Sequence, residues 1–344
     1  MPFIIHHNDD DGRAAGAIIY NECVRGRHYI AADQCVEWTH GMPAPRLNVS
    51  ELNNEDTIYI VDLALDDDIL SCITDVLKQR PDLHIVHIDH HITSIKRLEK
   101  MSSITMNGEE AEANNLYLSN VKHMFHVGHS ATLLCWAYAS FTLHEKQNLD
   151  MVEYDFTDNV SHVLITGIKG KSQYREIHIP MVLRYIDDYD VWRRALDPNT
   201  EYFHNAFFAV ENKSDIMSDL WASFIYTDDV QMLDTFMKAG EAITRYMRAN
   251  SAYMIKNAFV AEVNGHSCLA LNGHGNSNVF GDAIHEFECV CIFYYDGAKK
   301  MWKYSFYSAA ESECDVSKIC ELYGGGGHVH AAAFFLKEQT LFTI

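Results

Sequence analysis

The chain has 344 residues, 48% of them hydrophobic, and it carries 27 basic against 48 acidic side chains. The net charge of −21 at pH 7 argues against wide basic grooves for duplex or long single-stranded nucleic acid, because such a surface repels polyanions. A chain of this length exceeds what one hydrophobic core usually organises, so two domains are expected.

The sequence indicates neither a membrane segment nor a disulfide framework. No apolar run approaches the roughly 20 residues that a membrane helix requires, and residues 1–6 lack the basic start and long apolar core of a signal peptide. We therefore expect a cytoplasmic protein without a membrane partner. The nine cysteines are scattered and form no Cys-x-x-Cys pair, which favours reduced, mostly buried thiols over disulfides or a thiolate metal site.

The first predicted strand, at residues 2–5, leads into an acidic loop. In this loop His7, Asp9 and Asp11 alternate, so in an extended segment their side chains point to one side, and Gly12 allows a tight turn into the next helix. Adjacent carboxylates repel one another unless cations neutralise them. The loop is therefore expected to bind metal. The alternative is that these acids only stabilise the positive end of the helix that follows.

Two further predicted strands also end in acidic or imidazole side chains. A β-branched run carries Asp62 near its end, and a buried carboxylate is costly without a partner. An apolar run ends in Asp89, His90 and His91, and in open α/β sheets ligands bind outside the carboxyl ends of the strands. On its own, an Asp-His-His triplet is also compatible with a solvated loop. The recurrence at three strand ends favours a common site.

The middle of the chain is predicted to contain an irregular segment, a core helix and a further acidic run. Residues 101–122 are polar and predicted to be irregular, and 130–138 indicate a core helix. The run at 181–192 ends in a fourth acidic group, Asp187, Asp188 and Asp190. From 214 to 257 the apolar pattern is helical, and we interpret it as the connection between domains.

The last segment is predicted to contain short strands and a glycine-rich loop. The strands are expected at 259–263, 290–295 and 302–307, with a hairpin turn at Asp296-Gly297 between the last two. Four glycines, beginning at Gly324, precede His328. Such a loop would allow a ligand phosphate to lie close to backbone N–H groups.

The polar side chains at these termini form a mixed oxygen and nitrogen ligand set without thiolates. Its members are His7, Asp9, Asp11, Asp62, His90 and an acid from 187 to 190. Such ligands suit Mn²⁺ best, with Mg²⁺, Co²⁺ or Fe²⁺ as alternatives. Six or more ligands are too many for one tetrahedral zinc but fit two octahedral ions ~3.5–4 Å apart, a pair that activates water and neutralises charge at phosphorus. The predicted reaction class is phosphoester hydrolysis.

The order of the motifs resembles that of the DHH phosphoesterases with a C-terminal DHHA1 domain. The motifs are His-x-Asp-x-Asp-Gly, a strand Asp, Asp-His-His, Asp-x-Asp-x-Trp and Gly-Gly-Gly-Gly-His-x-x-Ala-Ala, and they span nearly the whole chain. The pattern is most similar to the branch of oligoribonucleases and nucleotide phosphodiesterases called nanoRNases. The resemblance implies an α/β fold with a parallel-sheet DHH catalytic domain at 1–195, a helical linker at 196–257 and a smaller mixed α/β DHHA1 substrate-binding domain at 258–344. The active site would lie in the cleft between the domains.

The resemblance also implies the metal ligands, carried over by position. One ion would be held by His7, Asp9 and Asp62, and the other by Asp11, Asp62, His90 and Asp188. Asp62 would thus bridge the two ions. Asp187 is an alternative to Asp188, because the register of that acidic run is ambiguous.

Further residues match the family's catalytic and substrate-binding positions. His91 matches the family's catalytic set together with Asp62 and His90. It would contact the substrate or hold a metal-binding side chain in place. Gly326, Gly327 and His328 match the family's nucleotide-holding loop. The sequence departs from the family at Ala333, where Gly is usual, and at Tyr307, where many members carry Arg, so the mode of phosphate anchoring is open.

The resemblance implies a metal-dependent phosphodiesterase, a phosphoric diester hydrolase that cleaves short oligonucleotides or linear dinucleotides to mononucleotides. The alternatives are a phosphoesterase for cyclic nucleotides or polyphosphate, and a nucleotide sensor without turnover, which the complete set of ligand positions disfavours. The expected partner is a short oligonucleotide or dinucleotide substrate and not a long duplex. A homodimer is left open by the sequence.

Overall fold

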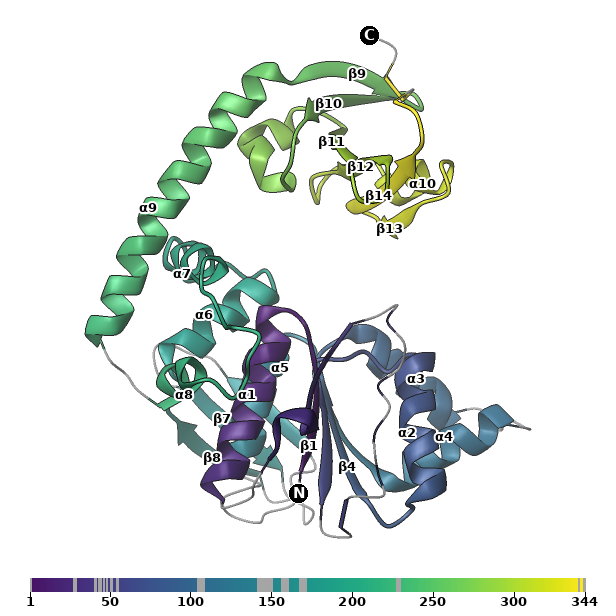
Figure 1. Cartoon of the computed structure of the whole chain (residues 1–344), viewed down its shortest axis with the longest axis vertical. Coiled ribbons are helices and arrows are strands. Elements are labelled where there is room, and N and C mark those ends of the chain that lie inside the picture. Colours follow the sequence, from purple (N-terminus) through teal and green to yellow (C-terminus); the bar gives the residue numbers. More distant parts are fainter. Residues whose placement is uncertain are drawn as a thin grey trace. The chain divides into compact units, whose positions relative to one another are not determined.

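The computed structural model describes residues 2–26, 30–39, 56–103, 109–140, 151–155, 161–166, 172–226, 230–339 and 341–342, together with residues 42, 45, 47, 49, 52 and 53. The chain falls into two compact units, Met1–Glu241 and Ala242–Ile344. The boundary lies inside helix α9 (Val230–Met254), which is the long helix in Figure 1. It thus falls within the segment 196–257 that was expected to link two domains.

Unit 1 is built on a parallel sheet with the strand order β2-β1-β3-β4-β5. Its strands are β1 (Phe3–His7), β2 (Cys35–Trp38), β3 (Thr57–Val61), β4 (His84–Asp89) and β5 (Val121–Phe125). Every pair of neighbours in it is parallel, so the carboxyl ends of β1, β3 and β4 meet at one edge of the sheet. The predicted α/β fold with a parallel sheet is confirmed.

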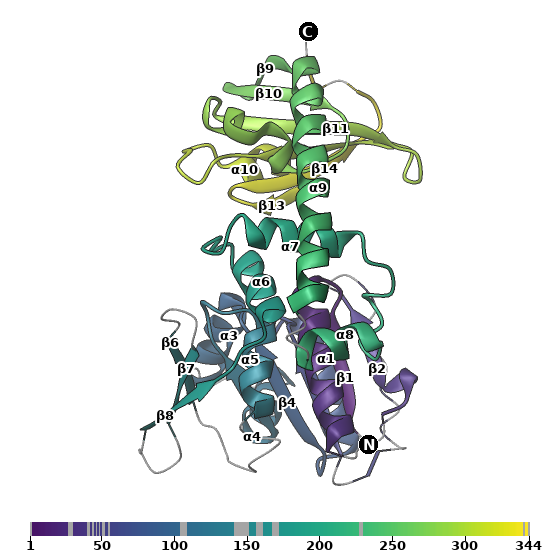
Figure 2. The ribbon, with the colours of Figure 1, turned by 90° about the vertical axis from the view of Figure 1, so that its left-hand side faces the viewer.

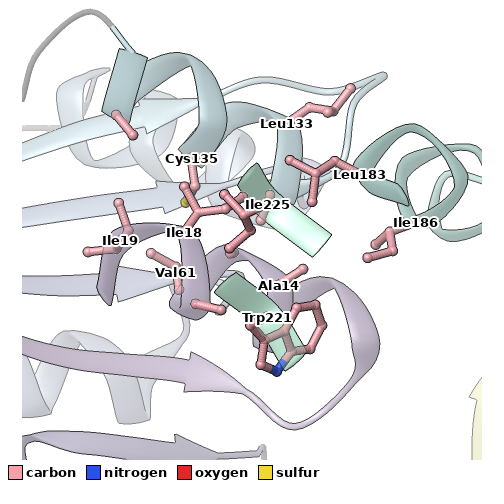
Figure 3. Packing of buried hydrophobic residues seen from close by; sticks show 14 of the residues in the cluster. Ala14, Ile18, Ile19, Val61, Leu133, Cys135, Leu183, Ile186, Trp221 and Ile225 are labelled. Atoms are coloured by element: carbon pink, nitrogen blue, oxygen red, sulfur yellow. The ribbon is translucent and has the colours of Figure 1, made fainter. Parts of the chain in front are cut away.

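Helices cover both faces of this sheet (Figure 1). One face carries α1 (Asp10–Arg25) and α5 (Ala131–Tyr138), and the other carries α2 (Asp67–Gln79), α3 (Ile92–Ser103) and α4 (Glu109–Asn120). Side chains alternate along the strands: Ile4 packs into the α1 layer and Ile5 into the α2 layer. In the α1 layer, Figure 3 shows Ile18, Cys135 and Ile225 beside one another.

Three more helices extend the α1 layer of unit 1. They are α6 (Met181–Asp190), α7 (Asn199–Phe208) and α8 (Asp219–Tyr226). Leu183, Phe203 and Trp221 from these helices are fully buried in the same core as Ile18, and Leu183 and Trp221 are labelled in Figure 3. The packing fixes α6 against α1 and α5, which places the C-terminal acids of α6 near the sheet edge.

A separate antiparallel sheet joins β6 (Met151–Asp155), β7 (Ser161–Thr166) and β8 (Ser172–Ile177). It is seen edge-on in Figure 2.

Unit 2 is a six-stranded mixed sheet in the order β13-β14-β12-β11-β10-β9. Its strands are β9 (Phe259–Val263), β10 (His266–Asn272), β11 (Cys289–Asp296), β12 (Met301–Tyr307), β13 (Gly326–His328) and β14 (Ala331–Leu336), and its α-helix beyond α9 is α10 (Val316–Glu321). Only β10 and β11 pair in parallel. Short 3-10 turns lie at Ala32–Gln34 in unit 1 and at Ile255–Asn257 and Ser277–His285 in unit 2.

Most predicted elements are present, with several differences. The strands expected at 259–263, 290–295 and 302–307 are β9, β11 and β12, and β11 and β12 form the predicted hairpin. The irregular structure expected over 101–122 is wrong for the described part of that segment, because α4 occupies most of it. The sequence analysis did not predict the strands β2, β5, β6, β7, β8, β10, β13 and β14.

The cysteines behave as the sequence predicts. All nine are free, and all are buried except the partly buried Cys35. Within the described residues, no helix combines the length and the apolar character needed to cross a membrane.

Candidate metal centre

Side chains from the ends of three strands and two helices meet at the carboxyl edge of the unit 1 sheet. They form three groups whose possible ligand atoms lie within 4.8 Å of one another. The groups are His7–Asp9–Asp62, Asp11–His90–Asp190 and Asp62–His90–His91. Asp62 and His90 each belong to two groups, so the three form one continuous centre.

The loop between β1 and α1 is held in shape by its own side chains. Asp9 is the N-cap of α1 and accepts a hydrogen bond from the Gly12 N–H at 2.8 Å, while its other oxygen lies 2.7 Å from His7 Nδ1. A Cβ atom at Gly12 would lie 2.6 Å from both the Cβ and the carbonyl oxygen of His7. Only glycine therefore permits this close approach of strand and helix.

Asp11 is buried between α1 and the start of α5. Its two carboxylate oxygens accept hydrogen bonds from the N–H groups of Ala131 and Thr132, each at 2.8 Å. These are N–H groups at the positive end of a helix, where an anion is stabilised. Burial nevertheless raises the pKa of Asp11, against the opposing effects of the His90 charge and the Thr132 hydrogen bonds. A cation at this side chain would stabilise its charged form.

Asp62 follows the last residue of β3 in a left-handed backbone conformation with φ of 57°. Its N–H bonds to the carbonyl of Ile88 at 2.9 Å. The residue is 2% exposed, yet neither carboxylate oxygen accepts a hydrogen bond. The nearest imidazole nitrogens are His90 Nε2 at 3.3 Å and His7 Nδ1 at 3.5 Å.

The environment of Asp62 favours the neutral acid in the absence of a cation. Burial, and then the charge of Asp11, raise its pKa well above the usual value. A buried carboxylate without hydrogen bonds is costly, and strained backbone conformations of this kind concentrate at functional sites. The unpartnered oxygens of Asp62 therefore fit a bridging metal ligand.

His90 lies among three carboxylates. Its Nε2 is 3.3 Å from Asp62 Oδ1, 3.4 Å from Asp190 Oδ2 and 3.8 Å from Asp11 Oδ2. Asp190 Oδ2 also accepts no hydrogen bond, and burial followed by the charge of Asp11 raises the pKa of Asp190 to about 9. One imidazole facing several carboxylates of raised pKa is a donor set suited to a divalent ion.

The position of Asp188 corrects the predicted ligand set. Its oxygens accept hydrogen bonds from Ala195 N at 2.9 Å, Leu196 N at 3.1 Å and the hydroxyl of Thr200. These bonds hold the turn after α6, and Asp190, two residues further along, faces His90 instead. We therefore replace Asp188 with Asp190 as the candidate ligand from this helix.

Asp187, the predicted alternative, also has structural partners. It accepts hydrogen bonds from Ser130 N at 2.7 Å and from Arg193 at 2.8 Å. The sequence includes Asp190 in the acidic run but gives no signal that separates it from its neighbours.

His91 is oriented by a buried aspartate that the sequence analysis did not assign to a role. His91 Nδ1 lies 2.7 Å from Asp89 Oδ1, and the Ser94 hydroxyl donates to the other oxygen of Asp89. Burial raises the pKa of Asp89, but the hydrogen bond from His91 and its charge outweigh this and lower it overall. The same hydrogen bond raises the pKa of His91. The available signal for this pair was its spacing. Asp89 and His91 are two residues apart at the end of a strand, as His7 and Asp9 are.

The predicted nucleotide-holding loop lies in unit 2. Gly326, Gly327 and His328 form β13, and all three are exposed. Gly327 has a φ of 150°, and a Cβ there would lie 2.5 Å from the carbonyl oxygen of Ala331, so this position requires glycine. Its role in binding a nucleotide stays a prediction, as does the site in a cleft between the domains.

The two family departures also lie in the unit 2 sheet. Ala333 pairs with Gly326 across β13 and β14, and Tyr307 pairs with Ala331 across β12 and β14.

Comparison with known sequences gives limited information. No family model matches the sequence. An uncharacterised protein of Acanthamoeba polyphaga mimivirus is 25% identical over 174 residues, which cover 48% of this chain and 39% of that protein. The chain thus spans well under half the length of that relative.

Solved structures share the fold at low sequence identity. The DHH domain of a protein described as a member of a family of ribosomal proteins is 13% identical, with a TM-score of 0.52, and the match covers 98% of this chain and 83% of that one. A structure described as the pGpG-specific phosphodiesterase PggH from Vibrio cholerae is 12% identical, with a TM-score of 0.50, and the match covers 97% and 92%. The chain therefore has the fold of a DHH-domain protein.

Proposed function

We propose that the chain is a metal-dependent phosphodiesterase that hydrolyses short oligonucleotides or linear dinucleotides to mononucleotides. The observation that carries this proposal is Asp62, a buried carboxylate whose two oxygens accept no hydrogen bond and lie between two groups of candidate ligands. A purely structural aspartate at this position would have hydrogen-bond partners.

The donor set supports two divalent ions. His7, Asp9 and Asp62 would hold one ion, and Asp11, Asp62, His90 and Asp190 would hold the other. The nitrogen and oxygen donors favour Mn²⁺, with Mg²⁺ or Co²⁺ also suited. When bound, such ions supply positive charge for the phosphate and an activated water.

The remaining polar residues of the centre would position the substrate. His91 is partly exposed, with 41% of its side chain accessible, and Asp89 holds its Nδ1. Because the hydrogen bond that His91 donates to Asp89 favours the charged imidazolium, His91 is suited to donate a hydrogen bond to a phosphate oxygen. Asp89 and Ser94 act on the substrate only through His91.

Two observations support a short nucleotide substrate. The net charge of −21 disfavours long polyanions, and a protein of similar fold is described as a phosphodiesterase specific for pGpG, a linear dinucleotide. The exposed Gly326–His328 strand in unit 2 would hold the nucleotide phosphate. Loss of one charge-assisted hydrogen bond in His328→Ala should lower dinucleotide cleavage about ten- to hundredfold and leave a small activated phosphodiester nearly unaffected.

The test is a metal and substrate screen on protein stripped with a chelator. We expect calorimetry to show about two Mn²⁺ ions per chain, and Mn²⁺ to restore hydrolysis of linear dinucleotides, with efficiency falling as oligonucleotides lengthen. Ca²⁺ should not support turnover, because it prefers oxygen ligands and this centre offers imidazoles. Cyclic dinucleotides and polyphosphate serve as competing substrates. Nucleotide binding without hydrolysis of any of them would contradict the proposal and favour a sensor.

A further inference from the structure

A cavity of about 390 Å³ opens beside the candidate metal centre within unit 1. Three candidate ligands, Asp9, Asp11 and Asp190, form part of its wall. Its volume falls in the range of roughly 300–1,000 Å³ found for small-molecule sites. A molecule in the cavity would therefore touch the same carboxylates that are proposed to hold metal.

Most of the other residues around the cavity are aromatic, and they come from α6 and α7. They include Tyr185, Tyr189, Phe203, His204, Phe207 and Phe208, and we call this space the aromatic pocket. Tyr189 and His204 stack with ring centroids 3.5 Å apart and planes inclined by 10°. Burial lowers the pKa of His204 to about 4, so its ring is uncharged at neutral pH. Phe208 is 77% exposed although its neighbour Phe207 is fully buried.

One charged pair gives the aromatic pocket a polar side. Lys213 Nζ donates to Asp10 Oδ1 at 2.8 Å and lies 4.9 Å and 5.6 Å from the ring centroids of Phe207 and Phe208. Asp10 stands between two candidate ligands in the sequence, but among the described residues it joins none of the metal-binding groups. The pair thus offers an ammonium donor and a carboxylate acceptor next to flat apolar walls.

We propose that the aromatic pocket binds the base of the nucleotide adjoining the scissile phosphate. This inference rests on the proposed function, because the occupant must carry a phosphodiester at its end nearest the metal centre. A nucleobase supplies the rest of what the pocket matches: a flat ring that stacks on aromatic side chains, and an edge with both hydrogen-bond donors and acceptors to face Asp10 and Lys213.

The proposal is tested by binding of mononucleotides, which are products of the proposed reaction and are not consumed by it. Calorimetry on the Mn²⁺-loaded protein compares AMP and GMP with ribose 5-phosphate, which lacks a base. One stacked base should make the mononucleotides bind about 5- to 150-fold more tightly. Phe208→Ala and His204→Ala should each lower this ratio severalfold without changing the affinity for ribose 5-phosphate.

Matched variants separate base stacking from general damage. Tyr246 is similarly exposed, at 71%, and Tyr246→Ala should leave the ratio unchanged. His204→Phe keeps a flat ring and should retain most of it. A ratio near one in the wild type, or an unchanged ratio in both alanine variants, would overturn the proposal. Absence of hydrolysis by the wild type, with the ratio as expected, would overturn the proposed reaction but leave the pocket assignment standing.

Discussion

The turn after β3 and the last turn of α6 each bury an aspartate, but they surround its charge differently. Asp188, 1% exposed, accepts hydrogen bonds from two backbone N–H groups of the segment after α6 and from the Thr200 hydroxyl of α7. Asp62, 2% exposed, accepts none. The first arrangement stabilises the connection between α6 and α7, whereas the second leaves a carboxylate that faces the imidazoles of His90 and His7 and that a bound cation would compensate.

Burial alone does not mark a functional acid in this protein. Asp89, Asp187 and Asp188 are all buried and all have hydrogen-bond partners. Asp62 and Asp190 have carboxylate oxygens without them. Unpartnered oxygens mark Asp62 and Asp190 among the acids of the candidate metal centre, whereas Asp9 and Asp11 belong to the same centre and also accept hydrogen bonds. The following changes test the distinction between Asp62 and Asp188.

The largest effect is expected from Asp62→Asn. Because Asp62 is proposed to bridge two ions, its loss should lower hydrolysis by more than the roughly 10²–10³-fold that one transition-state interaction supplies. Metal analysis should show reduced Mn²⁺ content. The exposed Asp68 after the same strand provides the control, since Asp68→Asn should change neither quantity. Two retained ions with activity within about tenfold of wild type would refute the bridging role.

A smaller loss is expected from Asp89→Asn. Asp89 orients His91 through a bond of 2.7 Å, and loss of such supporting contacts typically costs about 10–100-fold. The decrease should appear mainly in kcat, with Mn²⁺ content preserved. Loss of metal from this variant would show instead that Asp89, like Asp62, is needed for metal binding.

Asp188→Ala should affect stability more than chemistry. It leaves Ala195 N, Leu196 N and the Thr200 hydroxyl without their acceptor, and we expect a loss of about 2–4 kcal/mol in the free energy of unfolding. Denaturant titration measures this loss. Below the melting temperature the variant should still bind two ions. A fall in the metal content of the folded variant would contradict the assignment of Asp188 to stability and of Asp62 to metal binding.

The smallest effect concerns the pH dependence of the metal-free protein. The pKa of Asp190 is raised to about 9 by burial and by Asp11, so folding favours its protonated form. The contribution of protonated Asp190 to the free energy of unfolding is fully present below the pKa of about 3.9 that an aspartate has in the unfolded chain. It is lost as the pH rises through the higher pKa of the folded protein. Asp190→Asn should therefore raise Tm by several degrees at about pH 8 and hardly at about pH 4. Equal Tm values for both proteins at both pH values would contradict this assignment.

The sequence predicts the sheet edge well because strand ends are marked by local chemistry. Apolar, β-branched runs stop at His7, Asp62 and Asp89, and the parallel arrangement then brings these ends together. Low identity to other structures did not hinder this prediction, since it depends on a few positions and on the rule that parallel strands share a carboxyl edge.

The acids of α6 show why the rest could not be predicted. Which of Asp187, Asp188 and Asp190 faces the centre depends on the rotation of the helix about its axis. That rotation is fixed by Val182, Leu183 and Ile186 packing into the core of unit 1, a contact between distant segments. The aromatic pocket depends in the same way on the packing of α6 against α7. Helix α4 was missed because more than half of its residues are polar, which hides the helical spacing of Ala113, Leu116 and Tyr117 that pack against the core of unit 1.

Gly12 affects which ionic radius the candidate metal centre prefers. Since a single Cβ at this position would lie 2.6 Å from His7, the main chains of β1 and α1 are already in contact, and the loop that carries His7 and Asp9 has no room to contract. The spacing of the main-chain positions that carry these donors is thus set by this contact. Gly12→Ala, which removes no ligand, would widen this spacing and shift the preference of the centre toward larger cations.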